Sequence, residues 1–312
     1  MATRVRVVFL GNDAWSVPAL EALHAARPTL DLVAVVTRGP RPGRRGAGPA
    51  PTPVADAARR SGLPTLEMAT VRTGEGPDLL RSASPDVLAV VAYGELLTTE
   101  VLSAARLGAV NLHFSLLPRW RGASPVQHAI LAGDERTGAT TMLIDEGLDT
   151  GPLLDTVEER ILPDDDAGSL GNRLASIGAD LLVSSIGRLA DGLIEPRPQR
   201  GAATLAPKLG AEDRRLVWSE TAAALVRRVR AFAPEPGAST SFRGRAIKIL
   251  RARDVGAGGE PGSIVTVDDE GFVVAAREGG VRPLLLVPAG RTPMSAADFA
   301  RGAKPRVGER LG

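Results

Sequence analysis

Short apolar runs of strand length alternate with segments of helical periodicity over the first 190 residues of the chain. The clearest runs are Val5 to Leu10, Leu32 to Thr37, Asp86 to Ala92 and Ala109 to His113. Apolar runs that are separated by helices are typical of a mostly parallel sheet with both faces covered. The sequence therefore predicts an α/β fold for this part of the chain.

The pattern changes after Glu195 to Ala203, a segment with the proline, glycine and charge content of a linker. Thr221 to Phe232 has the pattern of an amphipathic helix with a basic face formed by Arg227, Arg228 and Arg230. Four short strand-like segments follow it at close spacing, without helices between them, up to Val287. This spacing favours a small β-barrel, a fold that often binds oligonucleotides. We predict a first domain over residues 1–192, a linker over 193–207 and a C-terminal domain over 208–312.

Composition excludes several classes of function. The 312 residues include no cysteine, which removes disulfides and all thiolate chemistry. The first strand-to-helix turn, Gly11 to Ser16, lacks the further glycines of a dinucleotide site, and no Gly-Lys-Ser or Gly-Lys-Thr phosphate loop is present. The three histidines share no metal-ligand spacing, so we expect no metal site. With no apolar run of membrane-spanning length, we expect a soluble, cytoplasmic protein.

Positive charge is concentrated toward the C-terminus. Residues 1–200 hold 20 Lys and Arg against 24 Asp and Glu, whereas residues 201–312 hold 18 against 12. A basic end domain favours a polyanionic partner such as RNA. Because nearly all the basic residues are arginine, a general bias in composition explains the same excess equally well.

Polar residues with catalytic potential follow the apolar run that ends at His113. Asn111 and His113 are two positions apart, so both side chains project from the same face of a strand. The carboxyl end of a parallel strand is where ligands bind in open sheets, although a strand cap and a turn histidine explain the pair equally well. Asp149, in a glycine-bracketed loop after the next apolar strand, favours the catalytic interpretation because its carboxylate could orient His113.

Three motifs together resemble the signature of folate-dependent formyltransferases. They are Asn111-Leu112-His113, Ser-Leu-Leu-Pro-x-x-Arg-Gly at 115–122, and Leu148-Asp149-Thr150-Gly151. Further motifs, among them Arg230-Ala231-Phe232 and Pro288-Ala289-Gly290, are similar to the C-terminal half of the methionyl-tRNA formyltransferases. The resemblance covers nearly the whole chain.

This resemblance implies a Rossmann-like sheet that binds 10-formyltetrahydrofolate as co-substrate, followed by an OB-like barrel that contacts tRNA. It implies transfer of the formyl group to the α-amine of methionyl initiator tRNA, which supports translation initiation, with no metal. It assigns the catalytic roles to Asn111, His113 and Asp149. The residues that it places around the folate are Val91, Ala92, Tyr93, Gly94, Ser115, Leu116, Leu117 and Pro118.

A Gly/Pro/Arg-rich insert, Arg38 to Pro49, follows the second predicted strand. By itself it is typical of a solvated loop. In the methionyl-tRNA formyltransferases a basic loop at this place reaches toward the acceptor stem, so the resemblance makes Arg41, Arg44 and Arg45 candidates for RNA contacts.

Two other functions stay open at this point. The same chemistry could act on a small amine, an amino-sugar nucleotide or a carrier-bound amino acid, or the chain could be an RNA-binding protein without enzymatic activity. In the leading interpretation the protein is a monomer whose partners are the folate donor and methionyl initiator tRNA.

Overall fold

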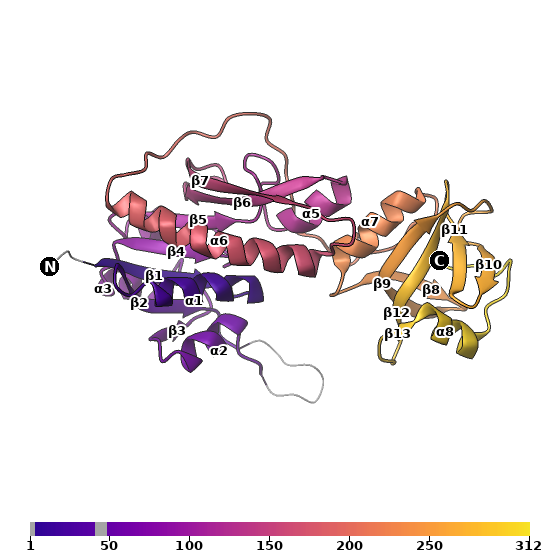
Figure 1. Cartoon of the computed structure of the whole chain (residues 1–312). Helices are drawn as coiled ribbons and strands as arrows, with labels where there is room; N and C mark the ends of the chain where they lie inside the picture. The colour runs from indigo at the N-terminus through magenta and orange to yellow at the C-terminus, as the bar shows by residue number, and fades with distance from the viewer. Residues whose placement is uncertain (1–3, 41–48) are drawn as a thin grey trace. The chain divides into compact units, whose positions relative to one another are not determined.

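The computed structural model describes residues 4–40 and 49–312 (Figure 1). By their contacts these residues divide into two compact units. The first unit takes in the chain to Pro125, then Arg136–Arg160 and Gly171–Pro207; the second takes in Val126–Glu135, Ile161–Leu170 and Lys208–Gly312. Pro207 is the last residue of the first unit, and all residues after it belong to the second. The domain limits expected from the sequence stay a prediction.

The first unit is built on a seven-stranded sheet with the order β3-β2-β1-β4-β5-β6-β7 among the described residues. Strands β1 to β5 run parallel to one another, whereas β6 is antiparallel to β5 and β7 is antiparallel to β6. This arrangement confirms the predicted mostly parallel sheet. The strands are β1 (Val5–Gly11), β2 (Leu30–Thr37), β3 (Thr65–Glu67), β4 (Val87–Val91), β5 (Ala109–His113), β6 (Arg136–Leu143) and β7 (Leu153–Arg160).

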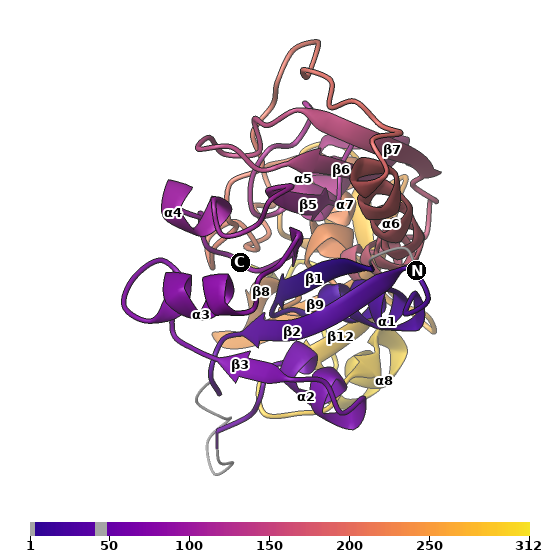
Figure 2. The ribbon, with the colours of Figure 1, turned by 90° about the vertical axis from the view of Figure 1, so that its left-hand side faces the viewer.

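Helices cover both faces of this sheet. One face packs alternate strand residues, such as Val8 and Leu88, against Leu80 of α3 and Val101 of α4. Figure 2 shows α1 and α6 on the opposite side. The helical elements of the first 190 residues are a 3₁₀ turn (Ala14–Ser16), α1 (Val17–Ala25), α2 (Pro53–Arg60), α3 (Gly76–Ser82), α4 (Thr99–Leu102), α5 (Pro125–Ala132) and α6 (Ala167–Ala190).

The order of the strands reverses between β1 and β4, so the connections on the two sides of this pair leave in opposite directions. At this point Gly11 of β1 pairs with Val91 of β4, and Val91 in turn pairs with Leu112 of β5. The carboxyl ends of three strands therefore lie side by side. In open α/β sheets this is the place where ligands bind.

The second unit contains a six-stranded antiparallel sheet with the order β10-β11-β12-β9-β8, with β13 paired to β12, among the described residues. Its core includes Leu225 of α7 and Phe272 of β11, which packs against Phe299 of α8. The elements are α7 (Ala222–Phe232), β8 (Ala238–Phe242), β9 (Arg245–Val255), β10 (Ile264–Asp268), β11 (Gly271–Ala275), β12 (Gly280–Pro288), β13 (Met294–Ser295) and α8 (Ala296–Ala303).

The last residues of the chain connect the two outer strands of this second sheet. Leu311 bridges to Phe242 at the end of β8, and Arg310 bridges to Ser263 just before β10. The Leu311 side chain is 4% exposed and belongs to the core of the unit. The C-terminal residues thus bring the edges of the sheet together, as the predicted OB-like barrel requires.

The basic face that the sequence places on α7 is used inside the second unit. Arg227 Nε donates to the carbonyl oxygen of Leu131 (3.1 Å), and Arg228 pairs with Glu220 (2.7 Å). Arg230 Nη2 donates to the carbonyl oxygen of Leu162 (2.8 Å), and burial lowers the pKa of this guanidinium. These arginines hold neighbouring segments in place.

No helix among residues 4–40 and 49–312 has both the length and the apolar character needed to cross a membrane.

We expect Leu311→Ala to lower the free energy of unfolding of the second unit by about 2–5 kcal/mol, because the truncated side chain leaves a cavity. Urea unfolding followed by tryptophan fluorescence, to which Trp218 of the same core contributes, measures the change. The control is Val307→Ala, since Val307 is 65% exposed and its truncation should cost less than about 0.5 kcal/mol. Equal unfolding midpoints for the two variants would contradict closure of the barrel by Leu311.

Candidate active site

Asn111 and His113 lie at the carboxyl end of β5, between β4 and β6. They point to the same face of the sheet as Ala109, which packs with α3 and α4. His113 is 6% exposed and Asn111 is half-buried. Strand alternation therefore brings the amide and the imidazole to one place, as the sequence predicts.

Asp149 approaches this pair from the loop between β6 and β7. Within the loop, Asp145 Oδ1 accepts the backbone N–H of Gly147 (3.0 Å) and the hydroxyl of Thr150 (2.6 Å). Asp149 itself has φ +51°, a left-handed conformation that is unfavourable for most side chains. Its Oδ2 accepts the backbone N–H of Gly122 (2.8 Å). Hydrogen bonds therefore fix the carboxylate itself as well as the loop that carries it.

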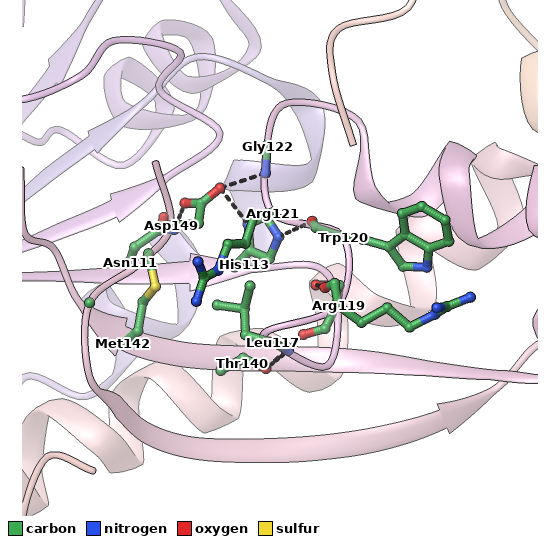
Figure 3. A network of polar contacts seen from close by, with 12 residues as sticks. Asn111, His113, Leu117, Arg119, Trp120, Arg121, Gly122, Thr140, Met142 and Asp149 are labelled. Carbon is green, nitrogen blue, oxygen red and sulfur yellow. Dashed lines mark hydrogen bonds and ion pairs between the residues drawn. The ribbon is translucent and has the colours of Figure 1, made fainter. Parts of the chain in front are cut away.

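The carboxylate of Asp149 lies beside both residues of β5 (Figure 3). Its Oδ2 is 3.7 Å from His113 Nδ1, and its Oδ1 is 3.5 Å from Asn111 Nδ2, which donates to it. The other ring nitrogen, His113 Nε2, is 2.8 Å from the carbonyl oxygen of Trp120. The structure thus brings the three residues predicted to be catalytic together, while their catalytic roles stay a prediction.

The loop that follows β5 is tied to the sheet by its own hydrogen bonds. Thr140 of β6 donates its hydroxyl to the carbonyl oxygen of Ser115 (2.6 Å), and the backbone N–H of Leu117 donates back to Thr140 Oγ1 (3.4 Å). The Ser115 hydroxyl donates to the carbonyl oxygen of Arg119 (2.5 Å). Of the predicted folate residues here, Ser115 and Leu117 are therefore buried in the loop, and Leu116 and Pro118 are half-buried.

The other predicted folate residues, Val91 to Gly94, continue from the end of β4. Ala92 and Gly94 are exposed and both have positive φ, whereas the Tyr93 ring is buried. Burial raises the pKa of the Tyr93 hydroxyl, which has no hydrogen-bond partner among the described residues.

Asn12, at the end of β1, connects this segment to β2. Its Nδ2 donates to the carbonyl oxygen of Tyr93, and its Oδ1 accepts from the Thr37 hydroxyl (3.0 Å) and the backbone N–H of Arg38 (2.8 Å). Sequence reasoning treated Asn12 only as part of a turn that lacks glycines. Its position directly after a buried strand is the signal that could have identified it.

Two further predictions concern metal and RNA. In the part of the chain that the structure describes, no three His, Asp or Glu side chains are grouped so that they could hold a metal ion. The candidates for RNA contacts, Arg41, Arg44 and Arg45, lie outside the described residues.

Two solved structures with a similar fold have titles that name a bound folate compound. HypX from Aquifex aeolicus in complex with tetrahydrofolic acid matches with a TM-score of 0.66 at 18% identity, covering 98% of this chain and 49% of that protein. An N-formyltransferase from Helicobacter canadensis, in complex with folinic acid and dTDP-3-aminofucose, matches with a TM-score of 0.65 at 17% identity, covering 91% of this chain and 98% of that one. At such identities the likeness shows the fold alone.

Full-length relatives are more similar in sequence. The methionyl-tRNA formyltransferase of Thermus thermophilus is 46% identical, covering 99% of both chains. That of Streptomyces coelicolor is 43% identical, covering 99% of this chain and all of the relative.

Two family models match separate parts of the chain. The formyl transferase model matches residues 4–186, and the model of the formyl transferase C-terminal domain matches residues 208–304. The resemblance carried by the motifs at 111–122 and 148–151 is confirmed. The chain belongs to the formyl transferase family.

Proposed function

We propose that this enzyme transfers the formyl group of 10-formyltetrahydrofolate to the α-amine of methionyl initiator tRNA. The observation that carries the proposal is the meeting of Asn111, His113 and Asp149 at the carboxyl end of the sheet. The full-length relatives named methionyl-tRNA formyltransferase support this acceptor. The folate compounds in the titles of two structures of similar fold support this donor.

Formyl transfer forms a bond between the amine nitrogen and the formyl carbon and breaks the bond from that carbon to N10 of the folate. The formyl oxygen becomes negatively charged as the amine attacks. Asn111 Nδ2 is the group that donates a hydrogen bond to this oxygen, in place of its long contact with Asp149. A preorganised donor of this kind contributes about 3 kcal/mol to stabilisation of the transition state.

The reaction also moves one proton from the attacking amine to N10. In the contact with Trp120, His113 Nε2 keeps its proton because a carbonyl oxygen only accepts. Nδ1 then holds the lone pair that takes the proton from the amine and later gives it to N10. Asp149, 3.7 Å from Nδ1, stabilises the positively charged ring between the two transfers.

The donor would bind where the ends of β1, β4 and β5 meet. Val91 to Gly94 and Ser115 to Pro118 border this place from neighbouring strands. Their buried apolar side chains suit the flat ring system of a folate, and the exposed backbone at Ala92 and Gly94 offers polar groups to its edges. The Tyr93 hydroxyl, without a partner among the described residues, is a further group that fits a polar ligand.

The acceptor would be recognised through the charge of its RNA. Arg41, Arg44 and Arg45 are the proposed contacts to the acceptor stem, supported by the insert's place after the second strand. The excess of basic residues beyond residue 200 is in keeping with an RNA partner. We further propose that the enzyme acts as a monomer in the cytoplasm.

A second candidate keeps the chemistry and changes the acceptor to a small amine such as an amino-sugar nucleotide. The specific observation in its favour is the similar fold of the Helicobacter canadensis N-formyltransferase, whose title names an aminosugar nucleotide.

Three acceptors offered with the same formyl donor separate the two candidates: methionyl-tRNA, free methionine and an amino-sugar nucleotide. We expect methionyl-tRNA to react faster by at least about 100-fold in kcat/KM, since a macromolecular acceptor adds binding contacts that are realised in the transition state. Equal rates with the sugar nucleotide would favour the second candidate instead.

Salt dependence tests the RNA partner independently. With methionyl-tRNA below KM, we expect the rate to fall by roughly 10-fold or more between 50 and 200 mM salt, because binding must neutralise several phosphates. The rate with free methionine serves as the control and should change little. A rate with methionyl-tRNA that is insensitive to salt would argue against phosphate contacts.

Single-turnover transfer by Asn111→Ala tests the proposed oxyanion donor. We expect the rate to fall about 100- to 1000-fold, while the affinity for the folate changes little. Asn172→Ala, on the exposed side of α6, is the matched control. If Asn111→Ala transferred formyl as fast as the parent, the role of Asn111 would be wrong.

A further inference from the structure

Residues 193–207, the segment expected to act as a linker, lie against the loops that carry the candidate active site. Most of the segment is exposed, but Gln199 and Thr204 are half-buried, and Ile194 and Ala206 are buried. Thr204 Oγ1 accepts the backbone N–H of Trp120 (2.9 Å), and the backbone N–H of Ala206 donates to the carbonyl oxygen of Arg121 (2.7 Å). The segment therefore holds the stretch that presents the Trp120 carbonyl to His113.

Both the nitrogen and the oxygen of the Gln199 side-chain amide form hydrogen bonds with the loops of the candidate active site. Its Nε2 donates to the carbonyl oxygens of Asp149 (2.8 Å) and Gly151 (2.9 Å). Its Oε1 accepts from Arg121 Nε (3.1 Å) and Nη2 (2.7 Å). One side chain thus joins the loop that carries Asp149 to the loop that carries Arg121 and Gly122.

The backbone of Asp149 benefits from such contacts. The left-handed region costs most residues other than glycine about 1–2 kcal/mol, and although aspartate tolerates it better than most, hydrogen bonds to the adjoining peptide groups stabilise the conformation seen at Asp149. Two hydrogen bonds from Gln199 fix the peptide groups at and near this residue. Only an amide offers two N–H groups to the carbonyls together with an acceptor for the guanidinium.

We propose that Gln199 is a positioning residue: it holds Asp149 where its carboxylate can contact both His113 and Asn111. The proposal deepens the proposed function and rests on it for its catalytic part. It predicts that loss of the Gln199 amide acts on the His113 ring through Asp149, although Gln199 touches neither the ring nor the reacting atoms.

The histidine rings give a readout that does not depend on activity. The chain has three histidines, so imidazole ¹H–¹⁵N spectra resolve His113 from His24 and His128. We expect Gln199→Met and Asp149→Asn each to shift the His113 ring signals, and the double variant to show little further shift. The signals of His24 stay unchanged as the internal reference.

Gln199→Glu provides a second variant of almost the same volume. It keeps the acceptor for Arg121 but directs an oxygen at the carbonyl oxygens of Asp149 and Gly151. We expect the same shift of His113 as in Gln199→Met, with a melting temperature close to that of the parent. The matched control for Gln199→Met is Glu195→Met, which also replaces a polar side chain of residues 193–207 with methionine but at an exposed position.

Kinetics test the same coupling in the working enzyme. We expect Gln199→Met to lower kcat at least 10-fold with the KM for the folate donor nearly unchanged. In the Asp149→Asn background the same replacement should lower kcat less than twofold, because residues that act through one another are not additive. A 10-fold loss in both backgrounds would overturn the proposal.

Different outcomes decide the role of Gln199 and the formyl transfer. If His113 signals in both Gln199 variants matched those of the parent, the positioning role would be wrong even in an active enzyme. If the parent formylated none of the acceptors, the proposed function would fail, and the spectra would still decide whether Gln199 positions Asp149.

Discussion

The carboxylate of Asp149 is the contact on which the candidate active site depends. It lies on a loop, whereas Asn111 and His113 lie on a strand, so its place is not set by the sheet alone. The N–H of Gly122 holds one oxygen, and this same oxygen faces the imidazole. Without the carboxylate, the amide and the ring would share a strand end but no common partner.

The topology of the sheet explains why these residues meet at the carboxyl ends of its central strands. The strand order reverses between β1 and β4, so the connections that follow these two strands leave in opposite directions, and β5 lies directly beside β4. Antiparallel pairing then places Thr140 of β6 opposite His113, where its hydroxyl anchors the loop that starts at Ser115. The proposed catalytic residues and the proposed donor-binding residues thus lie on adjacent segments at the carboxyl end of the sheet.

Sequence reasoning identified the buried elements and missed the polar ones. The apolar strands β1, β2, β4 and β5 were predicted within one or two residues, because a continuous apolar run is their signal. From Asp155 onward strand β7 alternates half-buried and exposed residues, most of them polar, at the sheet edge, and β8 consists largely of small polar residues, so neither shows such a run. Both form because neighbouring strands supply their hydrogen bonds.

Some residues of the candidate active site could likewise be predicted from the sequence, and others could not. Strand alternation predicted Asn111 and His113, and a glycine-bracketed loop suggested Asp149. Gln199 could not be predicted, because its partners are backbone carbonyls and an arginine that only the folded chain brings near, and its proline-rich surroundings indicate a linker. The arginines of α7 show the converse, since a basic face in the sequence proved to serve internal contacts.

A crystal structure with a non-reactive analogue of the formyl donor shows directly whether Asn111 and His113 face the formyl group. We expect the formyl oxygen to lie about 2.7–3.1 Å from Asn111 Nδ2, with His113 Nδ1 facing the site of amine attack. If the analogue bound with its formyl group beyond hydrogen-bond reach of both Asn111 and His113, their proposed roles would be wrong.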